Sequence, residues 1–578
     1  MKFATLCAAI TLALPSLLAS TAASEVGLET RRQHLLGMLS DPSMFPVRHR
    51  AFTEELQSRE WQFFHASLAQ GLRVEEANEY FAAREVQSNE WLALMMLNTH
   101  CEFKESLTAA ARGRMREIVF AFVRGLEHKD LGAITQASNE NHIINWKTIY
   151  LLADQEFGGG DPVLVTQARD SFKRWVQYRV ERGMEEFNSP HYASASFHAL
   201  LLMVDYYDDP SIKQWAHIGV DAMLANYALL SVNNVRGGPY FRTIFTDEFS
   251  ELAPLDENRN GLDDRLYEVG YFFFGNCPPP VYRENDGHIL ATCITTTSYR
   301  LPSVIFDLAT DKKSRGRYEV KLRRRDRFGK VYNLYYHITP AYSLGSMQNR
   351  VELDNFHSGY AKVNFDHWNN QVWELTFAHP QQILGPRRNL SNMSVERHNP
   401  NTANMQFRNV LFYKGQVLDY NDNLSQGNGS FSTQSIDDKT LSFWRVATGD
   451  GDVYAATTHY PDQQAGVLEV GLESDYDSFE HFQKAIRSAD SFCENTGLVT
   501  RYTSTMGDVI NYHHGQATVN GKPFALEDYP TYESPFANAA WDEAVMEFSI
   551  NRRLLRLDAR DLERPIRLET ASEAETSR

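Results

Sequence analysis

The sequence predicts an α+β fold with more than one domain, because a long helical half is followed by a half rich in strands. At 578 residues the chain is too long for a single hydrophobic core, so two large domains are expected. Apolar residues recur at helical spacing through most of residues 28–231. After residue 283, short β-branched and aromatic segments alternate with turns, which is typical of antiparallel sheets.

The N-terminal domain is predicted at residues 24–245. Short polar turns between its helices indicate a series of antiparallel helical hairpins. The number and length of these helices fit an incomplete α/α toroid, whose inner helices line a groove. The expected helices are 51–70, 74–84, 88–99, 107–126, 140–156, 162–182, 190–207 and 210–230.

Residues 246–282 are rich in Gly, Pro and Asp and are predicted to be a linker. A large antiparallel, β-sandwich-like domain is expected at 283–560, and the polar end at 561–578 reads as a disordered tail. The clearest strand segments are 332–338, 372–377, 410–413, 441–446 and 453–458.

The N-terminus predicts export. Residues 1–23 combine Lys2, an apolar run and small residues up to Ala23, which is the layout of a secretory signal peptide. No later stretch reaches the ~20 apolar residues that a membrane span requires. We therefore expect a soluble protein that is secreted or periplasmic. Cys277 and Cys293 flank a short segment and are candidates for a disulfide bond in such a compartment.

The formal net charge of −17 argues against nucleic acid as a partner. It does not exclude an anionic polysaccharide or oligosaccharide, because a cleft on an acidic protein can be locally basic. The aromatic content of 12% also gives ample surface for stacking on sugar rings.

Two polar clusters, each at the start of a predicted helix, are the main functional signal. The first is Asn139-Glu140-Asn141-His142, and the second runs from Glu186 to Tyr192 with Ser189 as the expected N-cap and Pro190 as the first helical residue. Asn141, His142 and Tyr192 then lie in first turns, where free N–H groups and the helix dipole favour an anionic group.

The Asn-His pair opening one helix, followed by Glu-x-x-Ser-Pro-x-Tyr opening a later one, resembles the α/α-toroid polysaccharide lyases of the heparinase II/III and alginate-lyase type. The resemblance covers residues 90–245 best. It implies that Asn141 or His142 acts together with Tyr192 on a uronic acid. It also implies a further His or Arg from the β domain, for which His398 is the favoured candidate among several histidines.

Elimination removes the C5 proton of a uronide, so the neighbouring carboxylate must be neutralised and a base must lie within reach. Asn141 suits the first task, because an amide donates to a carboxylate without adding charge. Tyr192 or His142 is the candidate base, and the hydroxyl of Tyr192 is the candidate acid for the leaving oxygen. We expect the substrate-binding residues to be Glu140, Glu186, Arg236, Tyr240 and Arg242.

The segment from Asp256 to Asp264 has oxygen ligands at alternate positions and a glycine at the turn, and so resembles a Ca²⁺ loop. Its candidate ligands are Asp256, Asn258, Asn260 and Asp264. It departs from the EF-hand pattern, because Tyr267 occupies the position of the last acidic ligand. Any Ca²⁺ here is expected to be structural, and no cofactor is expected to be required.

Two other functions fit the same residues. One is a glycoside hydrolase on this scaffold, with Glu140 and Glu186 as its paired carboxylates. The other is an exported protein that binds carbohydrate without turnover.

Overall fold

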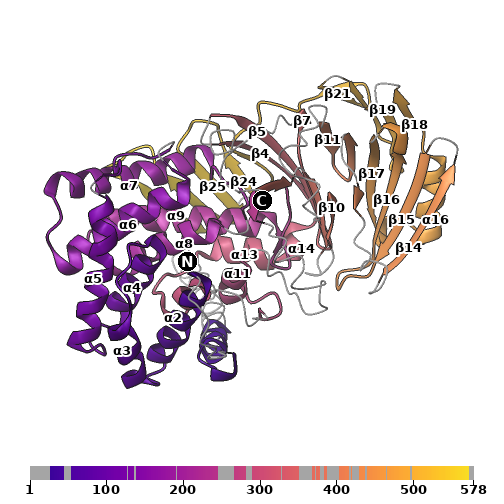
Figure 1. Ribbon diagram of the computed structural model, residues 1–578. Coiled ribbons are helices and arrows are strands. Elements are labelled where there is room, and N and C mark those ends of the chain that lie inside the picture. The colour runs from indigo at the N-terminus through magenta and orange to yellow at the C-terminus, as the bar shows by residue number, and fades with distance from the viewer. Residues whose placement is uncertain are drawn as a thin grey trace, which may run out of the picture.

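The computed structural model has helices in its N-terminal half and several antiparallel sheets in its C-terminal half, so the chain is an α+β protein with more than one domain (Figure 1). The structure describes residues 27–44, 54–126, 128–135, 138–189, 192–244, 266–280, 289–326, 329–350, 368–371, 373–377, 383–386, 403–414, 418–419, 429–436, 439–463, 465–494, 498–513 and 515–571. The predicted signal peptide lies outside these ranges.

Eight helices agree with the sequence prediction, and most of their ends lie within a few residues of the predicted ones. They are α2 (Glu54–Ala69), α3 (Val74–Ala83), α4 (Glu90–Phe103), α5 (Ala109–Leu126), α6 (Glu140–Phe157), α7 (Pro162–Arg182), α8 (Ala193–Tyr206) and α9 (Pro210–Leu230). Local signals fix several starts. The Asn89 side chain caps α4, and Asp161 and Asp209 cap α7 and α9, each followed by proline at the first helical position.

Helices α4 and α6 run in the same direction, with α5 returning between them. Glu90 and His142 are in contact at the two starts, and His100 lies 3.6 Å from Glu156 near the two ends. Helix α8 follows the same direction, because the Gln155 amide donates to the carbonyl of Tyr206 near the two ends. The starts of α4, α6 and α8 therefore lie at one end of the helical region.

More helices follow, one in the expected linker at 246–282 and three in the expected β domain at 283–560. They are α11 (Tyr267–Phe274), α12 (Ile289–Thr296), α13 (Ser303–Thr310) and the short α14 (Lys312–Arg315). Helix α11 falls within the expected linker at 246–282, and all its residues are buried. The helical region thus extends past residue 245, and the first strand of the largest sheet begins only at Tyr318.

The largest sheet has eleven strands. They are β4 (Tyr318–Arg325), β5 (Val331–Ile338), β6 (Tyr342–Met347), β9 (Trp373–Phe377), β10 (Ile383–Pro386), β13 (Leu418–Asp419), β23 (Tyr532–Glu533), β24 (Ala537–Ala539), β25 (Val545–Ile550), β26 (Arg553–Asp558) and β27 (Ile566–Ala571). Their order is β13-β10-β9-β6-β5-β4-β23-β24-β25-β26-β27, all antiparallel. Strand β27 falls within the expected tail at 561–578, so the sheet extends beyond the predicted boundary.

Four smaller sheets complete the described part of the chain. A seven-stranded sheet contains β7 (Asn349–Arg350), β11 (Ala403–Phe407), β12 (Val410–Lys414), β14 (Gly429–Ile436), β15 (Lys439–Val446), β16 (Val453–Tyr460) and β17 (Ala465–Leu472). A five-stranded sheet contains β18 (Ser491–Glu494), β19 (Leu498–Thr503), β20 (Val509–His513), β21 (Gln516–Val519) and β22 (Lys522–Phe524). The two-stranded sheets pair β1 (Ser231–Val232) with β2 (Val235–Arg236), and β3 (Tyr240–Ile244) with β8 (Trp368–Gln371).

Alternation along β12 shows how the sheets pack. Tyr413 stacks on Trp373 of the eleven-stranded sheet, with ring centroids 6.0 Å apart. Phe412 points to the other side and packs edge-on against Tyr502 of the five-stranded sheet. The seven-stranded sheet therefore lies between the other two, and the eleven-stranded sheet lies between it and the helices (Figure 1).

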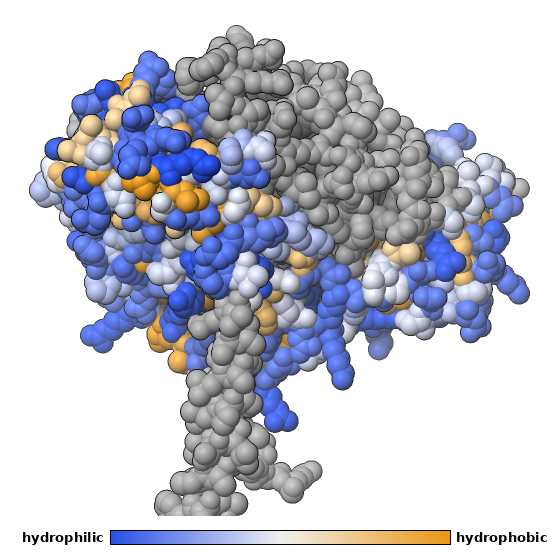
Figure 2. Space-filling view, turned by 90° about the horizontal axis from the view of Figure 1, so that it is seen from below, coloured by the Kyte–Doolittle hydropathy of each residue, from blue (hydrophilic) through white to orange (hydrophobic). Residues whose placement is uncertain are grey.

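Figure 2 shows a face on which hydrophilic residues predominate and hydrophobic residues form small separate groups. Within the described ranges, none of the helices combines the length and apolarity needed to cross a membrane. Neither Cys277 nor Cys293 is in a disulfide: the sulfur of Cys277 accepts from Asn234, and that of Cys293 accepts from Asn98, each at 3.0 Å. The disulfide considered from the sequence is therefore not formed.

Candidate functional site

The first turn of α6 carries Asn141 and His142, as the sequence predicted. Asn141 is completely buried, and neither atom of its amide group has a hydrogen-bond partner among the described residues. His142 keeps 30% of its side chain exposed. An unsatisfied buried amide is costly, so Asn141 is a candidate for pairing with a bound group.

Glu90, at the start of α4, holds the His142 ring and was missed by the sequence analysis. Both carboxylate oxygens lie 2.9 Å from His142 Nδ1. The same carboxylate accepts from the Asn145 amide and from the Trp146 indole N–H, each at 2.8 Å. A weak signal was available, because α4 and α6 both open with an Asn-Glu pair, Asn89-Glu90 and Asn139-Glu140.

Glu140 joins the start of α6 to the second cluster. Its carboxylate accepts from the backbone N–H groups of Glu185, at 2.9 Å, and Glu186, at 2.7 Å. It also pairs with Arg179 Nε at 3.0 Å. Burial raises the pKa of Glu140, with Arg179 opposing the shift and Glu185 and Glu186 adding to it.

This arrangement argues against Glu140 as a substrate-binding residue. Glu140 and Glu186 are 2% and 3% exposed, and the Glu140 carboxylate is already occupied by two backbone N–H groups and Arg179. Glu140 instead fixes the backbone that leads to Tyr192. Gly183 helps the chain reach this position, because it follows α7 with a φ of 74°, which a glycine tolerates.

The second cluster forms a turn before α8. The Ser189 hydroxyl accepts from the backbone N–H of Tyr192 at 3.1 Å. Helix α8 begins at Ala193, so Tyr192 occupies the N-cap position and not the first turn expected from a Pro190 start. Tyr192 is nonetheless already in helical backbone conformation, and a shift of this size is ordinary at a helix end.

The eleven-stranded sheet supports this turn from the other side. The Asn188 amide donates to the Tyr336 hydroxyl of β5 at 2.7 Å and to the Pro239 carbonyl at 3.2 Å. Glu374 of β9 accepts from the backbone N–H of Gly238 at 2.9 Å. The helical region and the sheet thus meet at the second cluster.

Arg236 also lies beside this cluster, but it is only 3% exposed. Its guanidinium donates to the Ser189 carbonyl at 3.3 Å and lies over the Tyr227 ring. In this position it supports the turn that leads to Tyr192.

The remaining predicted residues are not described. Tyr240 and Arg242 belong to β3, but their side chains lie outside the described part of the structure, as do His398 and the Ca²⁺ loop with Asp256, Asn258, Asn260 and Asp264. Among the residues that are described, no group of three or more His, Cys, Asp or Glu side chains is placed to hold a metal ion.

Two tryptophan rings adjoin His142, and of these Trp91 is partly exposed whereas Trp146 is buried. The rings of Trp91 and Trp146 lie 5.9 and 6.5 Å from the His142 ring, and the ammonium group of Lys129 lies 5.2 Å from the Trp146 ring. Lys129 is exposed. Aromatic faces and a cation are suitable contacts for the faces and the acidic groups of a charged sugar.

Comparisons with known proteins give little guidance. No family model matches the chain, and none of the curated proteins matches it. A solved structure of a heparinase III gene product with methylated lysines matches with a TM-score of 0.25 and 10% identity, over 92% of this chain and 76% of that chain.

Proposed function

We propose that this chain is a secreted or periplasmic polysaccharide lyase that cleaves a uronic-acid-containing polymer by β-elimination on an incomplete α/α toroid. The observation that carries the proposal is the buried amide of Asn141, which has no hydrogen-bond partner among the described residues, beside the His142 side chain, which is 30% exposed. The parallel starts of α4, α6 and α8 add the positive ends of three helix dipoles at the same end of the helical region.

The residues take the following roles. The Asn141 amide binds the uronate carboxylate and stabilises the charge that develops when C5 loses its proton. His142 Nε2 takes that proton, the electron pair forms the C4=C5 double bond, and the bond from C4 to the leaving oxygen breaks. The Tyr192 hydroxyl gives its proton to the leaving oxygen.

A hydrolase using Glu140 and Glu186 is disfavoured by their contacts. A hydrolase needs two carboxyl groups facing the sugar across a gap. Glu140 is instead enclosed by two backbone N–H groups and Arg179. We therefore expect Glu140→Gln to impair folding more than it impairs turnover.

A screen of uronate polymers with ultraviolet detection tests the proposal, because elimination creates an unsaturated uronide that absorbs. The unmodified protein should raise the absorbance with at least one polymer, and Tyr192→Phe should abolish the rise while keeping the melting temperature. Tyr206→Phe is the matched control, because it removes a hydroxyl from the opposite end of α8. New reducing ends without absorbance would indicate a hydrolase and overturn the proposal.

A further inference from the structure

Glu90 and His142 form a pair whose geometry specifies which ring nitrogen carries the proton. A carboxylate only accepts hydrogen bonds. Because both oxygens of Glu90 lie 2.9 Å from Nδ1, this nitrogen must carry the hydrogen. Nε2 is then left with its lone pair, and the ring hydrogen bonds that His142 makes with described residues all go through Nδ1.

The Glu90 carboxylate is itself firmly held. It is 11% exposed and accepts from three side chains on the facing side of α6, namely His142, Asn145 and Trp146. Asn89 caps the same helix start by accepting from the backbone N–H of Leu92 at 3.0 Å. A carboxylate fixed by this many contacts can hold an imidazole in one orientation.

We infer that Glu90 is a positioning residue that fixes the tautomer and orientation of His142, so that Nε2 is the basic atom presented to the ligand. The kinetic part of this inference rests on the proposed lyase function. The structural part, the state of the ring, does not. In the reaction Glu90 moves no proton; it keeps Nδ1 protonated and stabilises the positive charge that His142 gains when Nε2 takes the C5 proton.

The first experiment needs no substrate. Ring-nitrogen NMR spectra of protein labelled at histidine should show His142, assigned by its loss in His142→Asn, with Nδ1 protonated and Nε2 unprotonated. In Glu90→Gln both tautomers should be populated. A protonated Nε2 in the unmodified protein, or an unchanged ring in Glu90→Gln, would overturn the inference.

The second experiment is kinetic and uses the best polymer from the screen. Glu90→Gln should lower kcat about 10- to 100-fold with little change in KM, and Glu90→Asp should recover part of the loss. Glu156→Gln is the matched control, because it breaks a carboxylate–histidine contact between the same two helices at their far ends. It should leave kcat unchanged.

The outcomes separate the two proposals. No absorbance with any polymer would refute the lyase function, while the ring spectra would still decide the role of Glu90. An active protein with unaltered kcat in Glu90→Gln would refute the positioning role and leave the lyase function standing. If Glu90→Gln fails to fold, Glu90→Asp gives the same kinetic comparison with the carboxylate retained at a different reach.

Discussion

At the scale of single residues, the buried amide of Asn141 lowers stability because it has no hydrogen-bond partner among the described residues, and the same amide can bind a carboxylate. We expect Asn141→Ala to lower kcat about 10²- to 10³-fold, because one preorganised donor to the developing charge is lost. Its melting temperature should not fall, because the amide makes no hydrogen bond with a described residue, and an unpaired buried amide costs about 1–3 kcal/mol.

Asn98→Ala provides the control for this prediction. Asn98 is a buried amide on α4 that donates to the sulfur of Cys293 at 3.0 Å. Asn98→Ala should lower the melting temperature and leave kcat unchanged. If Asn141→Ala behaves in the same way, Asn141 is a structural residue and the carboxylate-binding role is wrong.

Lys147, on α6 like Asn141, should make the stability of the protein depend on pH. It is buried, its ammonium group donates to the Ala133 carbonyl at 2.6 Å, and burial lowers its pKa to about 7, although Asp130 opposes the shift. The unfolded chain holds this proton up to the ordinary pKa of 10.5. The stability that Lys147 contributes is therefore full above pH 10.5 and is lost as the pH falls through about 7.

Denaturant unfolding at several pH values between 7 and 10 measures this effect. The midpoint of the unmodified protein should rise with pH over this window by more than that of Lys147→Met. Lys129→Met is an exposed control that should keep the slope of the unmodified protein. Equal slopes in all three proteins would show that Lys147 keeps an ordinary pKa.

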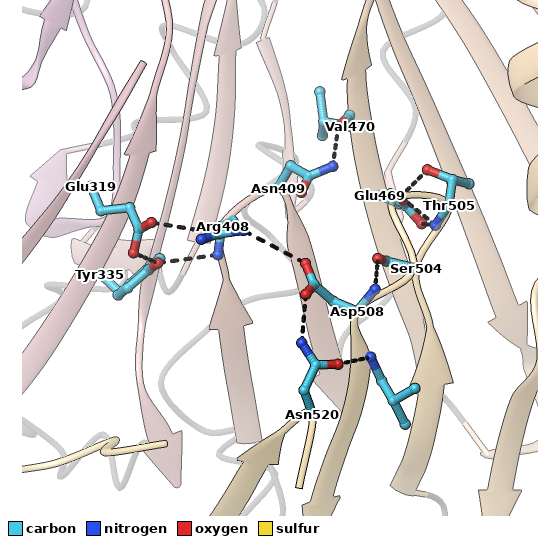
Figure 3. A network of polar contacts seen from close by, with 11 residues as sticks. Glu319, Tyr335, Arg408, Asn409, Glu469, Val470, Ser504, Thr505, Asp508 and Asn520 are labelled. Atoms are coloured by element: carbon cyan, nitrogen blue, oxygen red, sulfur yellow. Dashed lines mark hydrogen bonds and ion pairs between the residues drawn. The ribbon is translucent and has the colours of Figure 1, made fainter. Parts of the chain in front are cut away.

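At the scale of elements, the polar network in Figure 3 joins the sheets through contacts that contribute unequally to stability. Arg408, in the turn between β11 and β12, is half exposed and pairs with Glu319 at 3.3 Å and Asp508 at 3.7 Å. Glu469 of β17 is buried and accepts from the Tyr502 hydroxyl at 2.6 Å. Exposed ion pairs contribute about 0–1 kcal/mol, whereas a buried hydrogen bond to a charged group contributes about 1.5–3 kcal/mol.

We therefore expect Tyr502→Phe to lower the denaturation midpoint of the β region more than Arg408→Gln does. Glutamine is the appropriate replacement because it removes the charge and keeps a long side chain. Position 408 has a φ of 50°, and Gln and Arg should tolerate this backbone conformation about equally. The two variants should be compared at low and at 1 M salt. A larger loss in Arg408→Gln, disappearing in salt, would mean that the ion pairs dominate this network.

The elements also show what a sequence can predict. Helices α7 and α9 begin with an Asp-Pro pair and were located within a residue, because a cap and a proline act locally. Helix α11 was missed because Tyr267–Phe274 is apolar apart from Glu268 and is fully buried, so its apolar residues show little helical periodicity. Strand β27 was missed because it is almost wholly exposed and lies within a stretch that is polar overall.

At the scale of the whole molecule, the candidate site also divides into residues that a local sequence pattern reveals and residues that only the tertiary structure brings in. Asn141 and His142 were found because they are neighbours in the sequence. Glu90 lies 52 residues from His142, and Tyr336 lies 148 residues from Asn188. Such contacts are set by the packing of helices against each other and against the sheet, and no local pattern contains them.

The tertiary structure also ties β27, the last described strand, to the helical region. Arg567 of β27 pairs with the fully buried Asp221 of α9 at 2.5 Å, and the Tyr299 hydroxyl donates to the same carboxylate at 2.5 Å. Burial raises the pKa of Asp221, and Arg567 opposes this shift. We expect Arg567→Met to lower stability at pH 7 by roughly 3–5 kcal/mol, because a buried charge is left without its partner.

The loss should depend on pH in a defined direction. Without Arg567 the pKa of Asp221 rises further, and a group with a raised folded pKa contributes stability at low pH that is lost as the pH rises through that pKa. Thermal unfolding should therefore separate Arg567→Met from the unmodified protein more at pH 7 than at pH 5. Arg564→Met, at an exposed position just before β27, is the control and should match the unmodified protein at both pH values. If Arg567→Met melts normally at pH 7, β27 does not anchor the chain end, and residues 561–578 behave as the tail that their polar sequence suggests.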